Sequence, residues 1–184
     1  RYRFKLNTIS MQHPLHQFAY CPICGSKTFV EINEKAKQCD VCRFIYYFNP
    51  SAAVACFIRN PEGELLFVRR AKEPAKGTLD LPGGFTDMYE TAEEAVCREV
   101  KEETNLNVTG IRYLFSLPNI YPYSGFNVQT VDLFYECMVA DFSQARAEDD
   151  AEAIVVLSKT AVRPADFGLQ SIRLGVERYI AENM

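Results

Sequence analysis

Three glutamates stand close together in the sequence, at spacings that a helix would bring to one side. Glu99, Glu102 and Glu103 are three and four residues apart, so on a helix they share one stripe. Like charges at this spacing repel one another by about a few tenths of a kcal/mol per pair. A divalent cation would reverse this penalty, because Mg²⁺ and Mn²⁺ prefer hard oxygen ligands. The pattern therefore favours a metal site over an acidic surface helix.

A capping signal indicates where this helix begins. Thr91 precedes Glu94 by three residues, which makes a capping box and predicts a helix from about Ala92. Ala92, Val96 and Val100 form an apolar stripe opposite the glutamates. We expect this stripe to hold the helix on a hydrophobic core.

The stretch from Gly84 to Leu106 reads GFTDMYETAEEAVCREVKEETNL. It resembles the Nudix box, the signature of hydrolases that cleave a nucleoside diphosphate linked to another group. The residues that match the box are Gly84, Glu90, Arg98, Glu99, Val100, Glu102, Glu103 and Leu106. Asn105 stands where the family has its second glycine, and Tyr89 replaces a glycine that often precedes the first glutamate. Asn is the next-best residue after Gly for a left-handed helix C-cap, so the resemblance tolerates this change.

The resemblance implies a fold, a metal and roles for particular residues. The fold would be α/β, a Nudix α/β/α sandwich with a mixed β-sheet. Glu99 and Glu103, together with the carbonyl of Gly83, would bind catalytic Mg²⁺ or Mn²⁺, and Glu102 would complete the site directly or through water. Arg98 would orient Glu102 by a charge-assisted hydrogen bond. These four charged residues are the expected catalytic set.

A late acidic segment offers further metal ligands or the general base. Family members recruit the base either from the box or from a late acidic loop, which here reads Glu148-Asp149-Asp150 followed by Glu152. Asp149 is the first match for a late metal ligand, and Glu152 is the second. An exposed acidic loop without a metal remains the alternative.

Four cysteines near the start form a second candidate site. Cys21 and Cys24, then Cys39 and Cys42, form two pairs separated by fourteen residues. This is the spacing of a tetrahedral Cys₄ site for structural Zn²⁺. Too few apolar residues lie here for a free-standing core, so the metal would supply the folding energy. We predict a small β-rich zinc ribbon that acts mainly as a scaffold; binding of a nucleic acid or a protein is the alternative.

The remaining cysteines indicate a reducing compartment. The total of seven is odd, and no secretory signal precedes the ribbon, so disulfides are disfavoured and a cytoplasmic location is expected. Cys56, Cys97 and Cys137 lie in apolar runs and are interpreted as small buried hydrophobic residues.

Turn signals divide the chain at Asn49-Pro50. Residues 1–15 are expected to be a flexible arm or a tag or processing remnant, residues 16–49 the zinc ribbon and residues 50–184 the Nudix domain. Helices are expected from residue 92 and over 169–183. Strands are expected over 28–32, 36–38, 44–48, 51–59, 64–70, 79–81, 108–117, 129–140 and 153–157.

A zinc ribbon followed by a Nudix box resembles one subgroup, the NADH pyrophosphatases. Members carry a Ser-Gln-Pro-Trp-Pro-Phe-Pro run after the box, which holds the nicotinamide nucleotide. The corresponding residues 116–124 read SLPNIYPYS, with Leu117 in place of Gln, and the chain has no Trp. Tyr121 and Tyr123 are candidates to stack on a base, and Arg69 is a candidate contact for the diphosphate. A proline-stiffened loop with two surface tyrosines is the alternative.

These patterns predict metal-dependent hydrolysis of the diphosphate linkage in a nucleoside diphosphate derivative, first of all a dinucleotide such as NADH. An ADP-ribose or nucleotide-sugar pyrophosphatase is the first alternative, and a non-catalytic nucleotide sensor is a second. A zinc-ribbon RNA-binding module with decapping activity is a third.

The distribution of charge bears on the partners. The net charge is −4, with a balance of +4 over residues 1–50 and of −8 over residues 51–184. This argues against general binding of nucleic acids or membranes, and no run of eighteen apolar residues predicts a transmembrane helix. We expect a small-molecule nucleotide as the partner, and the aromatic residues that follow the ribbon would suit a homodimer interface.

Overall fold

The computed structural model describes residues 12–149 and 151–183. It contains two compact units that divide between Asn49 and Pro50. Residues 1–11 of the predicted arm lie outside the described residues. Leu15, by contrast, is fully buried, and the Nε2 atom of His13 donates to the carbonyl of Asn33 at 2.9 Å.

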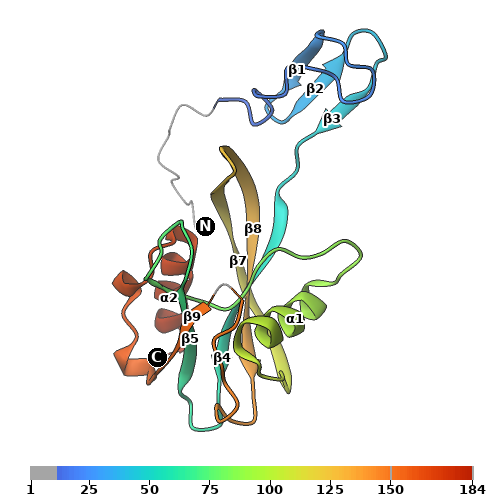
Figure 1. Ribbon diagram of the computed structural model, residues 1–184. Coiled ribbons are helices and arrows are strands. Elements are labelled where there is room, and N and C mark those ends of the chain that lie inside the picture. Colours follow the sequence, from blue (N-terminus) through green and yellow to red (C-terminus); the bar gives the residue numbers. More distant parts are fainter. Residues whose placement is uncertain (1–11, 150, 184) are drawn as a thin grey trace. The chain divides into compact units, whose positions relative to one another are not determined.

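The first unit is built on a three-stranded antiparallel sheet (Figure 1). Its strands, in the spatial order β1-β2-β3, are β1 (Phe29–Asn33), β2 (Ala36–Cys39) and β3 (Ile45–Tyr47). The apolar cluster of this unit contains only Cys21, Phe29 and Cys39 as buried members. Because a cluster of this size stabilises a fold very little, the unit needs a further source of stability.

The second unit is a six-stranded mixed sheet with a helix on each face. Its strand order is β6-β5-β4-β8-β7, with β9 paired to β5; β4 and β8 are parallel, and the other pairs are antiparallel. The prediction of an α/β sandwich, preceded in the sequence by a small β-rich unit, is therefore confirmed. The elements are β4 (Ser51–Arg59), β5 (Leu65–Arg70), β6 (Leu79–Asp80), α1 (Ala92–Thr104), β7 (Gly110–Tyr123), β8 (Phe126–Met138), β9 (Ala151–Leu157), the 3₁₀ turns η1 (Lys159–Ala161) and η2 (Pro164–Asp166), and α2 (Gln170–Asn183).

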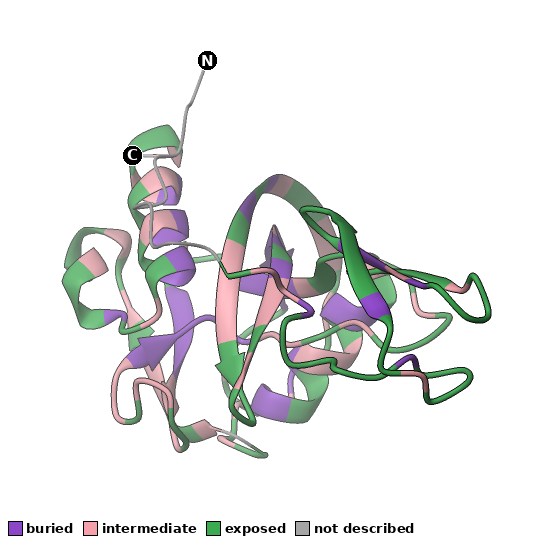
Figure 2. Cartoon of the chain, turned by 90° about the horizontal axis from the view of Figure 1, so that it is seen from above, coloured by how far each residue is buried: buried purple, intermediate pink, exposed green. Residues whose placement is uncertain are grey.

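Both faces of this sheet are apolar, because each packs against a helix (Figures 1 and 2). Along β4, Val54, Cys56 and Ile58 belong to the cluster that contains buried residues of α1. Ala55 and Phe57, which alternate with them, belong to the cluster that contains buried residues of α2. This alternation follows from the two-residue period of a strand. It gives the sheet an α1 face and an α2 face.

The ends of α1 follow the sequence signals. Thr91 accepts a hydrogen bond from the backbone N–H of Glu94, whose carboxylate accepts the backbone N–H of Thr91, so the capping box is formed. Asn105 ends the helix in the left-handed conformation, with φ 59°, and its N–H donates to the carbonyl of Lys101. The substitution of the second box glycine by Asn is thus accommodated without a change of the cap.

Residues 116–123 of the segment 116–124, for which a proline-stiffened loop was one interpretation, form a strand instead. They belong to β7, which pairs with β8 through Pro118 and Pro122 to the hairpin turn. β7 is an edge strand, so one of its sides has no partner strand. A proline placed where an N–H would face that unpaired side removes no hydrogen bond from the sheet. Ser124 and Gly125 form the turn with φ of 51° and 73°, the left-handed pair that two-residue hairpins require.

Cys97 is exposed, so its predicted burial is wrong, whereas Cys56 and Cys137 are buried as predicted. The apolar run around Cys97 misled the interpretation. On α1, Val96 and Val100 face the core. The residue after Val96 is turned by about 100° around the helix and points away from the core.

The close packing of α2 on the sheet depends on Gly175. A Cβ atom at this position would lie 2.3 Å from a ring carbon of Phe134, and Phe134 is fully buried. We expect Gly175→Ala to destabilise the protein by about 1–3 kcal/mol because the core becomes overpacked. Helix propensity alone would stabilise the same variant by about 1 kcal/mol, so urea unfolding distinguishes the two effects by sign. Glu177→Ala, at an exposed position of α2, is the control and should leave stability nearly unchanged.

Candidate active site

Two glycines bring the main chain against both β4 and the glutamates of α1. The carbonyl of Gly84 accepts the N–H of Val54 at 2.8 Å, so this segment continues the sheet. A Cβ atom on Gly83 would lie 2.1 Å from the carbonyl oxygen of Val54, and one on Gly84 would lie 2.5 Å from Oε1 of Glu99. No larger residue fits at Gly83, which meets the main chain of β4, and a side chain at Gly84 would displace the carboxylate of Glu99.

The three glutamates of α1 that match the box, Glu99, Glu102 and Glu103, each accept an N–H hydrogen bond. Oε2 of Glu103, a residue that is 9% exposed, accepts the backbone N–H of Gly83 at 3.2 Å. Glu99 and Glu102 accept N–H groups of Arg98 at 2.8 and 3.1 Å. The predicted contact of Arg98 with Glu102 is present in the structure, and it is accompanied by a closer contact with Glu99.

Arg98 also holds the loop that precedes the helix. Its Nε and one terminal nitrogen donate to the two oxygens of Glu90 at 2.8 and 2.9 Å, and the same terminal nitrogen donates to the carbonyl of Phe85 at 3.0 Å. This hydrogen bonding, together with the backbone N–H of Asp87, lowers the pKa of Glu90 to about 2. Glu90 is thus a permanently charged anchor for the loop rather than a group that exchanges protons near neutral pH.

Glu99 is partly buried within this cluster. Burial raises the pKa of Glu99, while the hydrogen bond and the charge of Arg98 lower it in part. Burial disfavours a free carboxylate, so a cation placed beside Glu99 would gain a strong partner. The donor set of Glu99, Glu103 and the Gly83 carbonyl consists of hard oxygens only, which fits Mg²⁺ or Mn²⁺.

The backbone of the late acidic segment is hydrogen-bonded to the last turn of α1. The N–H of Glu148 donates to the carbonyl of Glu103 at 3.1 Å, and the N–H of Arg146 donates to that of Thr104 at 3.0 Å. The side chains of Asp149 and Glu152 are exposed, and Asp150 lies outside the described residues. Within residues 12–149 and 151–183, the acidic side chains bring no three ligand atoms within 4.8 Å of one another.

The predicted substrate contacts occupy different surroundings. Arg69 donates to the carbonyl of Gly77 at 2.6 Å, and Tyr123 is 65% exposed beside the hairpin turn. Tyr121 packs against Phe85 in an edge-on arrangement, with ring centroids 6.1 Å apart, and also interacts with Arg70.

Phe85 was missed by sequence reasoning, although an aromatic residue directly after the Gly-Gly turn was a usable signal. Phe85 is 42% exposed and follows Gly84, which packs on Glu99. Its carbonyl group is bound by Arg98. The main chain at Phe85 is therefore held next to the carboxylate cluster by both covalent and hydrogen bonds, while its ring lies on the opposite face of the sheet, the face of its bridge partner Ala53.

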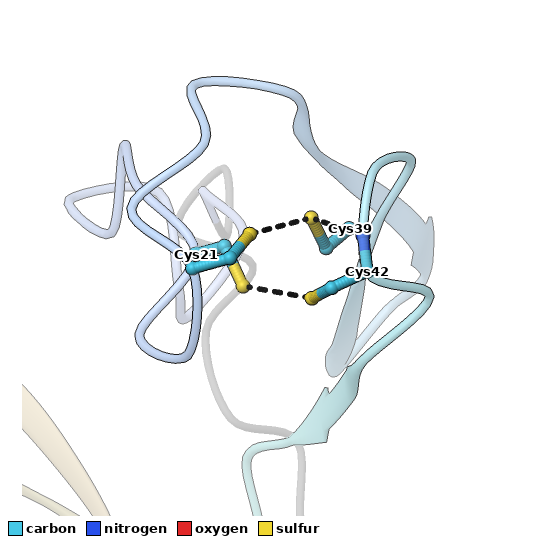
Figure 3. Close-up of side chains that lie close together, drawn as sticks. Cys21, Cys39 and Cys42 are labelled. Carbon is cyan, nitrogen blue, oxygen red and sulfur yellow. Dashed lines mark hydrogen bonds between the residues drawn. The ribbon is translucent and has the colours of Figure 1, made fainter.

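The four predicted zinc cysteines meet in the first unit (Figure 3). Their sulfur atoms lie within 4.8 Å of one another, and the Sγ atoms of Cys21 and Cys42, like those of Cys24 and Cys39, are 3.6 Å apart. A tetrahedron with Zn–S bonds of about 2.3 Å has S···S edges of about 3.8 Å, so the four sulfurs fit this ion closely.

Two similar turns aim the cysteines at one point. Gly25 donates to the carbonyl of Cys21 and Arg43 to that of Cys39, at 2.9 and 3.0 Å, and both take left-handed φ values of 71° and 62°. The backbone N–H of Cys42 lowers the pKa of Cys39 to about 6, against the opposing effect of burial. A thiolate is thus favoured at Cys39, which is the form that binds metals.

The chain matches a family model and several known proteins. The model described as NUDIX domain matches residues 49–174. A protein named NAD-capped RNA hydrolase NudC, from Vibrio atlanticus, is 30% identical over 156 residues, which cover 85% of this chain and 56% of that protein. An ADP-ribose pyrophosphatase from Methanocaldococcus jannaschii is 39% identical over 88 residues, which cover 47% of this chain and 52% of that protein. This chain thus spans about half the length of both relatives.

A solved structure shares the fold. The crystal structure of a NUDIX hydrolase from Nitrosomonas europaea has a TM-score of 0.69 and 23% sequence identity, and the match covers 89% of this chain and 91% of that one. Among the described residues, no helix has both the length and the apolar character needed to cross a membrane. The family model covers more than half of the sequence and includes every residue of the glycine-bound carboxylate cluster, and the chain therefore belongs to the Nudix hydrolase family.

Proposed function

We propose that the protein hydrolyses the diphosphate linkage of a dinucleotide of the NAD type, with Mg²⁺ or Mn²⁺ bound by Glu99, Glu103 and the carbonyl of Gly83. The observation that carries this proposal is the approach of the glycine pair to Glu103, which is buried, and to Glu99, which is partly buried. It creates a set of hard oxygen donors next in the chain to Phe85, an exposed aromatic residue. Relatives named as hydrolases of NAD-capped RNA and of ADP-ribose support a substrate that contains adenosine diphosphate.

The protein's own side chains would hold the metal and orient the water molecule and the diphosphate. When bound, the metal would supply a Lewis acid that lowers the pKa of a water molecule and stabilises charge on the phosphates. Arg98 keeps Glu99 and Glu102 directed to one side of α1. Glu102, whose side chain is half exposed, is free to complete the site directly or through water.

Free dinucleotides are the preferred substrates over RNA in this proposal. The residues from 51 onwards carry a charge balance of −8, which disfavours a long phosphate backbone. A panel of NADH, NAD⁺, ADP-ribose, nucleotide sugars and NAD-capped RNA, tested with Mg²⁺ or Mn²⁺, compares the candidates. Mononucleotide products from NADH or NAD⁺ support the proposal, and cleavage of none of these compounds would favour a nucleotide sensor.

Replacing a metal ligand should abolish this reaction without unfolding the protein. We expect Glu99→Gln and Glu103→Gln to lower kcat by about 100-fold or more, because the neutral amide is a poor ligand for Mg²⁺. Glu93→Gln is the matched control, since Glu93 is exposed in the first turn of the same helix, and it should retain activity. Turnover by either ligand variant at the wild-type rate would reject the metal assignment.

Of the two late carboxylates, Glu152 is better supported as a ligand or base than Asp149, which the sequence favoured. Glu152 lies on β9, a strand paired with β5, at a bulge where Ala153 and Ala151 pair with the consecutive residues Arg69 and Arg70, and bulges often redirect a side chain next to an active site; Asp149 lies in the turn before this strand. We expect Glu152→Gln to lower kcat by about tenfold or more and Asp149→Asn to have little effect. Steady-state kinetics with the substrate that the panel identifies measures both, and the reverse order would favour Asp149.

We further propose that residues 16–49 form a zinc ribbon that is a scaffold, ahead of a Nudix domain over residues 50–184. Because structural zinc contributes about 10 kcal/mol or more to the folding of small modules, chelation should unfold the first unit. Cys39→Ser should prevent zinc binding, whereas Cys97→Ser, which changes an exposed cysteine of α1, should not. Zinc content and thermal melting are measured together, and a melting curve unchanged after verified loss of zinc would contradict the scaffold role.

A further inference from the structure

A buried carboxylate stands beside the exposed aromatic ring of the active site. Asp132 on β8 is 6% exposed, and its register partner on β4 is Ala53. Ala53 also forms an antiparallel bridge with Phe85. Register partners share one face of a sheet, so Phe85, Ala53 and Asp132 form a row across three adjacent segments on the α2 face.

The middle of this row is small and partly open to solvent. Ala53 contributes only a methyl group and is of intermediate exposure. Adjacent strands lie about 4.8 Å apart, so the ring of Phe85 and the carboxylate of Asp132 are attached about 10 Å from each other. Tyr121 packs edge-on against Phe85 and adds a second aromatic ring. The row thus combines flat apolar surface with a carboxylate, separated by little more than one methyl group.

Asp132 has few partners for a buried carboxylate. In the described part of the chain, Asp132 accepts a hydrogen bond from the hydroxyl of Thr130, at 2.6 Å. The guanidinium of Arg70 forms an ion pair with Asp80 instead. Burial raises the pKa of Asp80, Arg70 opposes that rise, and the charge of Asp132 adds to it. A carboxylate accepts about four hydrogen bonds, so Asp132 retains capacity for a donor from outside the chain.

We propose that Asp132 is a specificity-determining residue that accepts a hydrogen bond from the exocyclic NH₂ group of the substrate's ring. Two rings of an NAD-type dinucleotide carry such a group: adenine has an amino group, and nicotinamide has a carboxamide. In either case the ring lies over Ala53 beside Phe85 on the α2 face, and the diphosphate passes round the main chain at Gly84 and Phe85 to the carboxylates of α1 on the other face. Phe85 directly follows Gly84, so this path is short.

In this proposal, Asp132 supplies the polar contact to the substrate ring that the glutamine of the NADH pyrophosphatase run would otherwise supply. Leu117, at the position of that glutamine, is the register partner of Asp132 on β7 and is buried in the apolar core. At this level of the hairpin the polar side chain therefore comes from β8. Thr130, two residues earlier on the same face, fixes the orientation of the carboxylate.

This inference rests on the proposed function, but binding tests it without hydrolysis. The full chain is titrated by calorimetry with AMP and IMP, which differ by an amino and an oxo group. It is also titrated with nicotinamide mononucleotide and nicotinic acid mononucleotide, which differ by an amide and a carboxylate. For one of the two pairs, the wild type should bind the NH₂ member about 10- to 100-fold more tightly, as expected for a hydrogen bond to a buried charged group.

The variant Asp132→Asn should reduce that ratio to about threefold or less, because an amide can donate to an oxygen as well as accept from NH₂. The pair that responds identifies the ring. Asp141→Asn, the same change at an exposed turn, should leave the ratio unchanged. A wild type that discriminates within neither pair, or a ratio that persists in Asp132→Asn, overturns the assignment.

Ala53→Val tests the same site without altering the carboxylate. The added methyl groups would occupy the space between Phe85 and Asp132, and affinity for AMP or nicotinamide mononucleotide should fall by about tenfold or more. Wild-type affinity in a folded Ala53→Val variant overturns the placement of the ring. Absence of hydrolysis by the wild type would instead reject only the proposed function, because neither titration depends on turnover.

Discussion

One guanidinium group organises the acidic end of α1. Arg98 lies within ion-pair distance of four carboxylates, those of Asp87, Glu90, Glu99 and Glu102. Without it, these charges would repel one another across a loop and one helical turn. Because Arg98 binds both oxygens of Glu90, the loop is fastened to the helix with a defined geometry rather than by net attraction alone. The oxygen of Glu99 that Arg98 binds also lies against Gly84, 2.5 Å from where a Cβ atom would stand.

The glycine pair provides the second half of this arrangement. Arg98 fixes the loop from the side of the helix, while the hydrogen bond between Val54 and Gly84 fixes it from the side of the sheet. Gly83 lies too close to the main chain of Val54 to carry a side chain, and a side chain at Gly84 would displace the carboxylate of Glu99. The site is therefore built on two rigid elements, a central strand and a capped helix, as a preorganised metal site requires. Any change that separates α1 from β4 should disturb the ligands first.

Sequence reasoning succeeded where local signals determine structure. The capping box at Thr91 and the C-cap at Asn105 depend on contacts within four residues, and both formed as predicted. The meeting of the four cysteines in one cluster was likewise predicted from their spacing in the sequence. The errors arose where tertiary context decides. Cys97 lies in an apolar run but on the outer side of the helix.

The proline-rich segment of β7 shows the same limit and has a consequence for recognition. Two prolines and a turn indicated a loop, yet the segment is a strand because β8 pairs with its whole length. Only that pairing brings Leu117 opposite Asp132. Similarly, only the bridge between Ala53 and Phe85 brings the ring into the same row. Asp132, Ala53 and Phe85 are far apart in the sequence, and none belongs to a motif with the others. Register across strands determines which side chains meet, so the chemistry that distinguishes one ring from another is the part of this site least visible in the sequence.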